Sequence, residues 1–291
     1  YPTEEQKILL GKTFGCCRFL YNQMLNDKIR EYEKTKKMLN NTPAMYKKEY
    51  PFLKEVDSLA LANVQLHLEK AYKNFFRDPK IGFPRFKSKH HSKNSYTTNV
   101  VNGNILVESK KIRLPKLKWI AMKKHREPAE GLRLKSVTVS MEPSGKYFAS
   151  LLYEGYSCEN QAAGPDYSTA KILGIDYAMQ GMAVFSEKVE TEEAGFFRKN
   201  EKRLAREQRK LSRCVRGSHN YELQKKKVAR CHEKIRNQRR DHLHKLSRKI
   251  ADGYDAAAVE DIDMKAMGQC LHFGKSVQDN GYGMFREMLD Y

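Results

Sequence analysis

Two acidic residues could form a metal site, because each follows an apolar run that is typical of a buried strand. The run 171–175 leads into Asp176, and the run 255–259 leads into Glu260. If the two strands are neighbours in one sheet, their carboxylates can share Mg²⁺. A bound Mg²⁺ activates water and stabilises the charge that builds on a phosphodiester, so this pattern indicates nuclease chemistry.

A second interpretation gives such acids a structural role. Acids that follow a strand often cap the next helix, and Asp261 or Asp263 could cap the segment that begins at Met264. The spacing alone leaves both interpretations open.

The two acids lie 84 positions apart, so a sheet must bring them together. The run 182–186 predicts a further strand, joined to the strand 171–176 by a tight turn over 177–181. From Lys171 onward the pattern is that of an α/β domain with a mixed sheet.

Positive charge is concentrated between the two acidic strands. The 291 residues carry 55 Lys and Arg against 35 Asp and Glu, a net charge of +20, and the segment 198–249 alone carries +15. Gly217-Ser218 interrupts this segment, which predicts two helices over 197–215 and 221–251. Each has a thin apolar seam and a wide basic face, which favours a nucleic-acid backbone over a membrane surface. The candidate phosphate contacts in this hairpin are Arg198, Lys202, Arg206, Arg209, Arg213, Lys226, Arg230, Arg236 and Arg239.

The N-terminal part reads as helices followed by strands. Helices are predicted over 4–34 and 57–76, the second capped by Asp57 or Ser58, and a basic connector follows over 78–93. Strands are predicted over 95–101, 105–107 and 111–114, with a hairpin that pairs 132–141 with 147–153, and then a linker over 155–170. In the connector we take Arg85, Lys87 and Lys89 as nucleic-acid contacts. The aromatic residues Phe83, Phe86 and Tyr96 could stack on bases or simply pack.

Several classes of protein are excluded by composition. No run of 18 apolar residues predicts a membrane span, and no signal peptide is visible. The six cysteines form no CxxC pair, so we expect reduced cytosolic thiols and no zinc site within these residues. Cys16 and Cys17 fall on a helical apolar pattern, which predicts core packing.

Four sequence elements resemble the TnpB proteins, transposon-encoded RNA-guided nucleases related to the miniature type V CRISPR effectors. These are Gly-Phe-Pro-Arg-Phe-Lys at 82–87, Gly-Ile-Asp at 174–176, the basic hairpin 198–247 and Val-Glu-Asp at 259–261, in the family's order. The resemblance implies an α+β multidomain fold. It consists of a helical recognition part with its connector (1–94), a β-barrel wedge domain (95–160) and a RuvC/RNase H-like nuclease domain (161–291) with the basic insertion at 197–251.

The resemblance also implies the site and its cofactors. Asp176 and Glu260 would be the first two catalytic carboxylates and would hold two Mg²⁺ ions. A third catalytic Asp and a four-Cys zinc finger, which would bind Zn²⁺, are expected beyond Tyr291. A chain that ended there would cleave feebly or not at all, and we favour a longer protein.

The expected partners are a guide RNA and target double-stranded DNA, bound by a monomer with one RNA in the bacterial cytoplasm at the nucleoid. Amides of the helix 58–76 such as Asn63 would check a short motif beside the target, and guide pairing would read the sequence. Three alternatives stay open: a nuclease-inactive RNA-guided repressor, a type V CRISPR effector, and a plain RNA-binding or architectural protein that uses the basic hairpin alone.

Overall fold

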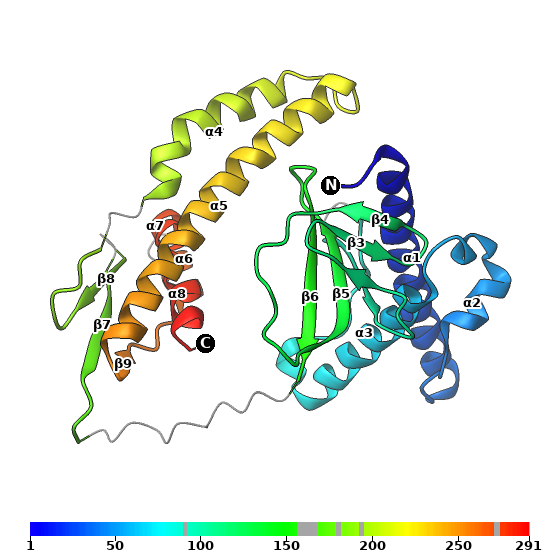
Figure 1. Ribbon diagram of the computed structural model, residues 1–291, viewed down its shortest axis with the longest axis horizontal. Coiled ribbons are helices and arrows are strands. Elements are labelled where there is room, and N and C mark those ends of the chain that lie inside the picture. The colour runs from blue at the N-terminus through cyan, green and yellow to red at the C-terminus, as the bar shows by residue number, and fades with distance from the viewer. Residues whose placement is uncertain (90–91, 156–167, 179–181, 192–194, 271–273, 291) are drawn as a thin grey trace. The chain divides into compact units, whose positions relative to one another are not determined.

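The computed structural model describes residues 1–291 apart from 90–91, 156–167, 179–181, 192–194, 271–273 and 291. The chain forms two compact units, Tyr1–Cys158 and Glu159–Tyr291 (Figure 1). The linker predicted over 155–170 lies largely outside the described residues.

Two long helices with well-defined caps dominate the start of the first unit. α1 (Glu4–Thr35) begins with a capping box between Thr3 and Gln6. α3 (Ser58–Arg77) is capped by Asp57, whose carboxylate accepts a hydrogen bond from the Leu59 amide. Both predicted helices are confirmed. The unit also contains α2 (Pro43–Glu49) and the short 3-10 helices η1 (Pro51–Lys54) and η2 (Pro79–Ile81).

Two antiparallel three-stranded sheets complete the first unit. One has the order β1-β5-β6 and the other the order β2-β3-β4. Among the described residues neither sheet closes on itself, so the predicted β-barrel is corrected to two open sheets. Alternating strand patterns suit both arrangements, so the sequence could not separate them. The strands are β1 (Asn94–Asn99), β2 (Leu106–Val107), β3 (Lys111–Leu114), β4 (Lys118–Ala121), β5 (Arg133–Met141) and β6 (Tyr147–Glu154).

One hydrophobic core joins the helices of the first unit to its strands. Leu20 of α1, Leu61 and Leu68 of α3 and Val137 of β5 are all fully buried in it. Cys16 and Cys17 are buried in the same core, which confirms their predicted packing role. The helical part and the strands that follow it therefore pack together as one unit.

The second unit is built on the sheet β8-β7-β9. β7 (Ile172–Ala178) is central, runs antiparallel to β8 (Met182–Phe185) and runs parallel to β9 (Ala256–Val259). The predicted mixed sheet is confirmed. β7 continues two residues beyond Asp176, so Asp176 lies within the strand rather than at its end. The rest of the turn predicted over 177–181 lies outside the described residues.

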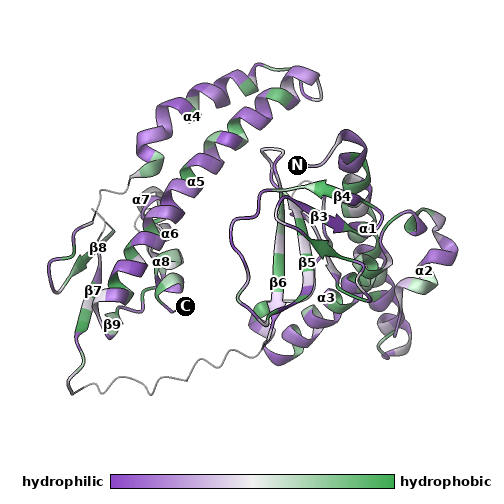
Figure 2. Cartoon of the chain, in the orientation of Figure 1, coloured by the Kyte–Doolittle hydropathy of each residue, from purple (hydrophilic) through white to green (hydrophobic). Residues whose placement is uncertain are grey.

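A helical hairpin connects β8 to β9. α4 (Phe196–Ser212) and α5 (His219–Gly253) run antiparallel side by side, which confirms the two helices predicted on either side of Gly217-Ser218 (Figure 1). Ser218 caps α5. Both helices are mostly hydrophilic (Figure 2). The described part of the chain ends with α6 (Met264–Cys270), α7 (Gly274–Asn280) and α8 (Tyr282–Leu289). None of the described helices combines the length and hydropathy that crossing a membrane would need.

Asp57 joins α3 to the first sheet, and its loss should destabilise the first unit. Its carboxylate caps α3 and also accepts a hydrogen bond from the buried Thr98 hydroxyl of β1. We expect Asp57→Ala to lower the free energy of unfolding by about 2 kcal/mol, because a cap is lost and a buried hydroxyl loses its partner. Chemical denaturation measures this change. Asp78→Ala, which removes the cap of the three-residue helix η2, is the control and should cost under about 1 kcal/mol. Equal losses for the two variants would contradict this account.

Candidate active site and nucleic-acid interface

The parallel pairing of β7 and β9 brings the two predicted acids together. Ile175 lies opposite Val259, the last residue of β9, so Asp176 of β7 and Glu260, which directly follows β9, occupy the next positions along the two chains. Both side chains are exposed. The two carboxyl groups are close enough to share a hydrogen bond, and this hydrogen bond, with the nearby Asp176 charge, raises the pKa of Glu260. A close pair of exposed carboxyl groups is suited to a divalent cation.

The buried face of the sheet fixes this arrangement. Leu173 and Ile175 alternate with Asp176 along β7 and are buried. They pack in one cluster with Leu243, Leu246 and Ile250 of α5 and Tyr282 and Phe285 of α8. Because successive side chains of a strand point to opposite faces, this packing directs Asp176 away from the core.

Gly174 allows the neighbouring chain to approach β7 closely. Its amide donates to the Ser186 hydroxyl at 2.9 Å, and its carbonyl accepts from the Ser186 amide at 2.9 Å. A Cβ at this position would lie 3.3 Å from the Ser186 Cβ, so a larger residue would push the two segments apart.

The acids next to Glu260 have other roles. The Asp263 carboxylate accepts from the Ala266 amide at 3.0 Å and thus caps α6, as one of the sequence interpretations predicts. The Asp261 carboxylate binds the Arg286 guanidinium of α8 at 2.7 Å. Within the described ranges no group of three or more His, Cys, Asp or Glu side chains could hold a metal ion, so the candidate site consists of two carboxylates.

The basic hairpin presents most of its cations to solvent. Leu204, Cys231 and Ile235 form a small core between α4 and α5, and the Gln224 amide of α5 donates to the Glu207 carboxylate of α4 at 2.7 Å. Eight of the nine predicted phosphate contacts in the hairpin are exposed: Arg198, Lys202, Arg206, Arg209, Arg213, Lys226, Arg230 and Arg236.

Arg239 differs from the other eight, because it lies inside the second unit. Its Nε donates to the Asp279 carbonyl oxygen at 2.9 Å, and its Nη2 lies 3.4 Å from the Asp279 carboxylate. Its side chain is only 18% exposed. Its contacts are those of a structural residue, and we leave it out of the proposed nucleic-acid surface.

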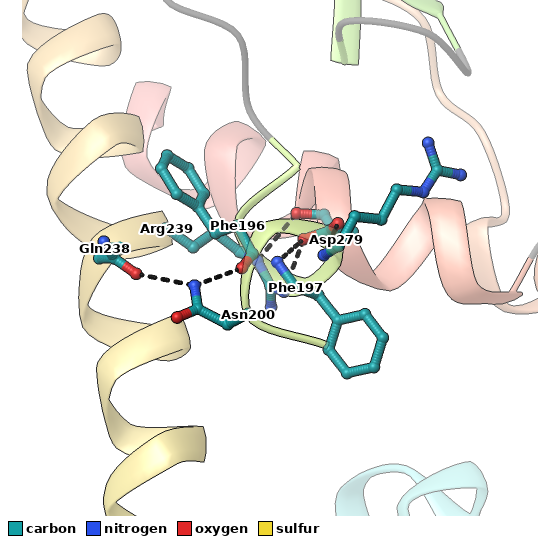
Figure 3. Close-up of polar contacts among 7 residues, drawn as sticks. Phe196, Phe197, Asn200, Gln238, Arg239 and Asp279 are labelled. Atoms are coloured by element: carbon teal, nitrogen blue, oxygen red, sulfur yellow. Dashed lines mark hydrogen bonds and ion pairs between the residues drawn. The ribbon is translucent and has the colours of Figure 1, made fainter. Parts of the chain in front are cut away.

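Asp279 of α7 has a structural role that the sequence did not reveal (Figure 3). Its buried carboxylate accepts hydrogen bonds from the amides of Phe197 at 2.8 Å and Arg198 at 3.3 Å, at the first turn of α4. α4 has only Gly195 at its N-cap, with no side-chain cap of its own. Asp279 therefore supplies the missing cap from a distant segment and places negative charge at the positive end of the helix.

The contacts predicted in the first unit have mixed surroundings. Arg85 and Lys89 are exposed, whereas Asn63 is buried and its amide donates to the Leu59 carbonyl at 3.0 Å within its own helix. The burial of Asn63 does not suit a direct contact with a base.

The three aromatic candidates also differ in exposure. Tyr96 is buried, with its ring 5.9 Å from that of Phe14, so packing accounts for it. Phe83 contacts the rings of Tyr72 and Phe75 edge-on. Phe86 is 56% exposed and is the aromatic side chain of this group best placed for stacking.

Loss of Asp279 should loosen the base of the hairpin. We expect Asp279→Ala to lower the free energy of unfolding by about 2 kcal/mol, because α4 would lose its cap and the partly buried Arg239 would lose the carboxylate while keeping the backbone carbonyl of residue 279. Urea denaturation followed by circular dichroism measures this loss. Asp241→Ala is the matched control, because it removes an exposed i,i+4 pair with Lys245 and should change the stability by less than about 1 kcal/mol. Asp279→Ala with the stability of wild type would contradict the assigned role.

The carboxyl pair should destabilise the metal-free protein at neutral pH. A raised pKa means that folded Glu260 binds its proton more tightly than unfolded Glu260 does. The contribution of protonated Glu260 to folding stability is therefore fully present below the ordinary pKa of 4.5, and it is lost as the pH rises through the raised pKa. Asp176→Asn removes the like charge, so we expect a slightly higher Tm than wild type at pH 7 without Mg²⁺ and no difference near pH 4. Asp261→Asn, which loses its ion pair with Arg286, should give no such rise. A lower Tm for Asp176→Asn at pH 7 would refute the repulsion.

The family comparisons agree with the sequence resemblance. Residues 155–270 match a family model described as "Probable transposase" (OrfB_IS605), and residues 1–37 match its "Helix-turn-helix domain". Most of the second match is a single continuous helix in the structure, α1.

Two relatives match essentially the whole chain. A "Putative RNA-guided DNA endonuclease" from Streptomyces pristinaespiralis is 31% identical over 100% of this chain and 72% of its own length. A "Putative RNA-guided DNA endonuclease InsQ" from Escherichia coli K12 is 31% identical over 99% of this chain and 72% of its own length. "Virulence protein VsdF" from Salmonella dublin is 36% identical over 31% of this chain and 88% of its own length. The chain therefore belongs to the OrfB (TnpB) family of IS605-type transposons.

Proposed function

We propose that this protein is an RNA-guided DNA endonuclease that uses a transposon-derived guide RNA to hydrolyse complementary DNA beside a short motif. The observation that carries the proposal is the adjacency of Asp176 of β7 and Glu260, the residue after β9, two parallel strands that flank the basic hairpin in the chain. Membership of the family and the names of the two relatives that match the whole chain support the same activity.

Asp176 and Glu260 are the residues that would hold Mg²⁺. Carboxylate oxygens are the ligands that this ion prefers, and the hydrogen bond that raises the pKa of Glu260 supports the closeness of its carboxyl group to that of Asp176. When bound, Mg²⁺ lowers the pKa of a coordinated water and stabilises charge on the phosphodiester. The sheet and the core beneath it keep both carboxylates in place before the substrate arrives, so little rearrangement would be needed.

The exposed cations of α4 and α5 would hold the nucleic acid near the acids. Lys and Arg contacts to phosphates give salt-dependent affinity but no choice of sequence. Sequence would be read by pairing between the guide RNA and the target strand. In the first unit Arg85, Lys89 and the exposed ring of Phe86 would also contact nucleic acid. We propose a monomer that binds one guide RNA and one DNA target.

The test is cleavage by the purified protein with its bound RNA. The RNA is sequenced, and the complex is incubated with matching duplex DNA with and without Mg²⁺. We expect Mg²⁺-dependent cleavage. Loss of a residue that only supports a metal ligand lowers activity about 10–100-fold, so we expect Asp176→Ala, which removes a direct ligand, to lower the cleavage rate by more than that. The control is Asp261→Ala, which removes a neighbouring carboxylate that binds Arg286 and should retain cleavage.

The outcomes separate this proposal from its alternatives. Guided binding to matching DNA without cleavage by the wild-type protein would identify a guided repressor instead. Absence of a discrete co-purified RNA would contradict any guided mechanism. Equal cleavage by Asp176→Ala and wild type would contradict the assigned site.

A further inference from the structure

A small cleft in the first unit gathers basic residues from three separate segments, namely α1, α3 and the connector. It has a volume of about 200 Å³ and lies between α1, α3, the connector and β1. Arg18, His67, Lys87 and Lys93 line it, together with the hydroxyl-bearing residues Ser92 and Ser95, and no Asp or Glu is among its lining residues. Such a cleft is smaller than the about 300–1,000 Å³ of typical small-molecule sites, so it suits a single phosphate-sized group.

Lys87 is held at this cleft by specific contacts. The Asn22 side chain accepts from the Lys87 amide at 2.7 Å and donates to the Lys87 carbonyl at 2.8 Å, which fixes the backbone of the connector against α1. The Lys87 ammonium lies 4.0 Å from the centroid of the Tyr21 ring. Lys87 as a whole residue is exposed, but packing around its ammonium removes part of the hydration and lowers the pKa of Lys87. An anion in the cleft would compensate for that loss.

The basic residues of the cleft lie close enough to affect one another's pKa. Burial, and then the charges of Lys87 and Lys70, lower the pKa of His67. The two smaller causes place positive charge near the imidazole, whereas the largest cause is burial alone. A groove in the second unit differs, because acids among its lining residues pair with cations there: Asp241 with Lys245 at 2.7 Å and Asp252 with Arg248 at 2.9 Å. Unlike that groove, the cleft has cations with no acid to neutralise them among the residues that line it.

We propose that this cleft binds a phosphate group of a nucleic-acid backbone, held by Arg18, Lys87 and Lys93 with Ser92 and Ser95 as further donors. The proposal rests on the proposed nucleic-acid partner, and it adds a fixed anchor in the first unit to the exposed cations of the hairpin. A phosphate here would position one strand without reading its bases. The guide RNA and the target DNA could each supply this phosphate.

The first test measures affinity and its salt dependence. Fluorescence anisotropy follows the binding of the full chain to single-stranded RNA, single-stranded DNA and duplex DNA of several sequences over a range of NaCl concentrations. The variants are Arg18→Ala and Lys93→Ala. Lys73→Ala is the matched control, because it removes one exposed charge from α3 outside the cleft. Lys93 is exposed, so its replacement should leave the fold intact.

We expect each cleft variant to bind about tenfold more weakly at every sequence and to lower the slope of log K against log salt by about 1. Lys73→Ala should change the affinity by less than about twofold. The strand type whose binding falls is the one whose phosphate occupies the cleft. Cleft variants that match Lys73→Ala for all three nucleic acids would overturn the proposal. Competition by polyglutamate as strong as that by the oligonucleotides would also overturn it, in favour of an acidic peptide partner.

A second measurement reports on the cleft directly. NMR titration measures the pKa of the His67 imidazole with and without a bound anion, with inorganic phosphate and the oligonucleotides as probes. We expect binding of either probe to raise this pKa in wild type and to raise it much less in Arg18→Ala. A His67 pKa that stays the same with either probe would overturn the proposal. Failure here is distinct from failure of the proposed function: cleavage that depends on Asp176 would survive it, whereas a wild-type protein that binds no nucleic acid would contradict both.

Discussion

The parallel pairing of β7 with β9 determines where the chemistry of this protein can take place. It joins segments 84 residues apart and places Asp176 beside Glu260 at the next step of the register. The pairing is maintained by apolar packing on the other face of β7, where Leu173 and Ile175 lie against α5 and α8. A one-residue slip would turn Asp176 towards the core, so the hydrophobic pattern of the strand specifies the site as firmly as it specifies the sheet.

The same sheet has to accommodate a long, strongly basic insertion between its paired strands. Self-repulsion along α4 and α5 opposes their close packing, and the apolar seam between them is thin. Contacts that reach out of the hairpin compensate. Asp279 caps α4 and binds Arg239 of α5 (Figure 3). Leu243, Leu246 and Ile250 of α5 pack in the core beneath the sheet. The base of the hairpin is therefore attached to the fold, while most of its cations stay available on the surface.

Sequence reasoning succeeded where a feature depends on local pattern. The apolar runs before Asp176 and Glu260, the break at Gly217-Ser218 and the cap at Asp57 each predicted an element that the structure contains. It failed where a feature depends on distant partners. The amides that Asp279 caps belong to residues more than 80 positions earlier, and nothing in the sequence pattern of α7 predicts this contact. Asn63 and Arg239 look like surface contacts until their neighbours are known. The prediction of a β-barrel was wrong for a similar reason, because closure of a barrel depends on how strands of separate sheets pair.

The central claim is that Asp176 and Glu260 form one cation site, and the pKa of Glu260 measures this most directly. Carboxyl NMR titration of the protein, with and without Mg²⁺, follows this group. We predict a pKa above the ordinary value without the ion, because of the neighbouring carboxylate, and a pKa below that value with it, because the cation favours the ionised form. Asp176→Asn should remove the elevation in the absence of Mg²⁺. A Glu260 pKa that is the same with and without Mg²⁺ would contradict the shared site.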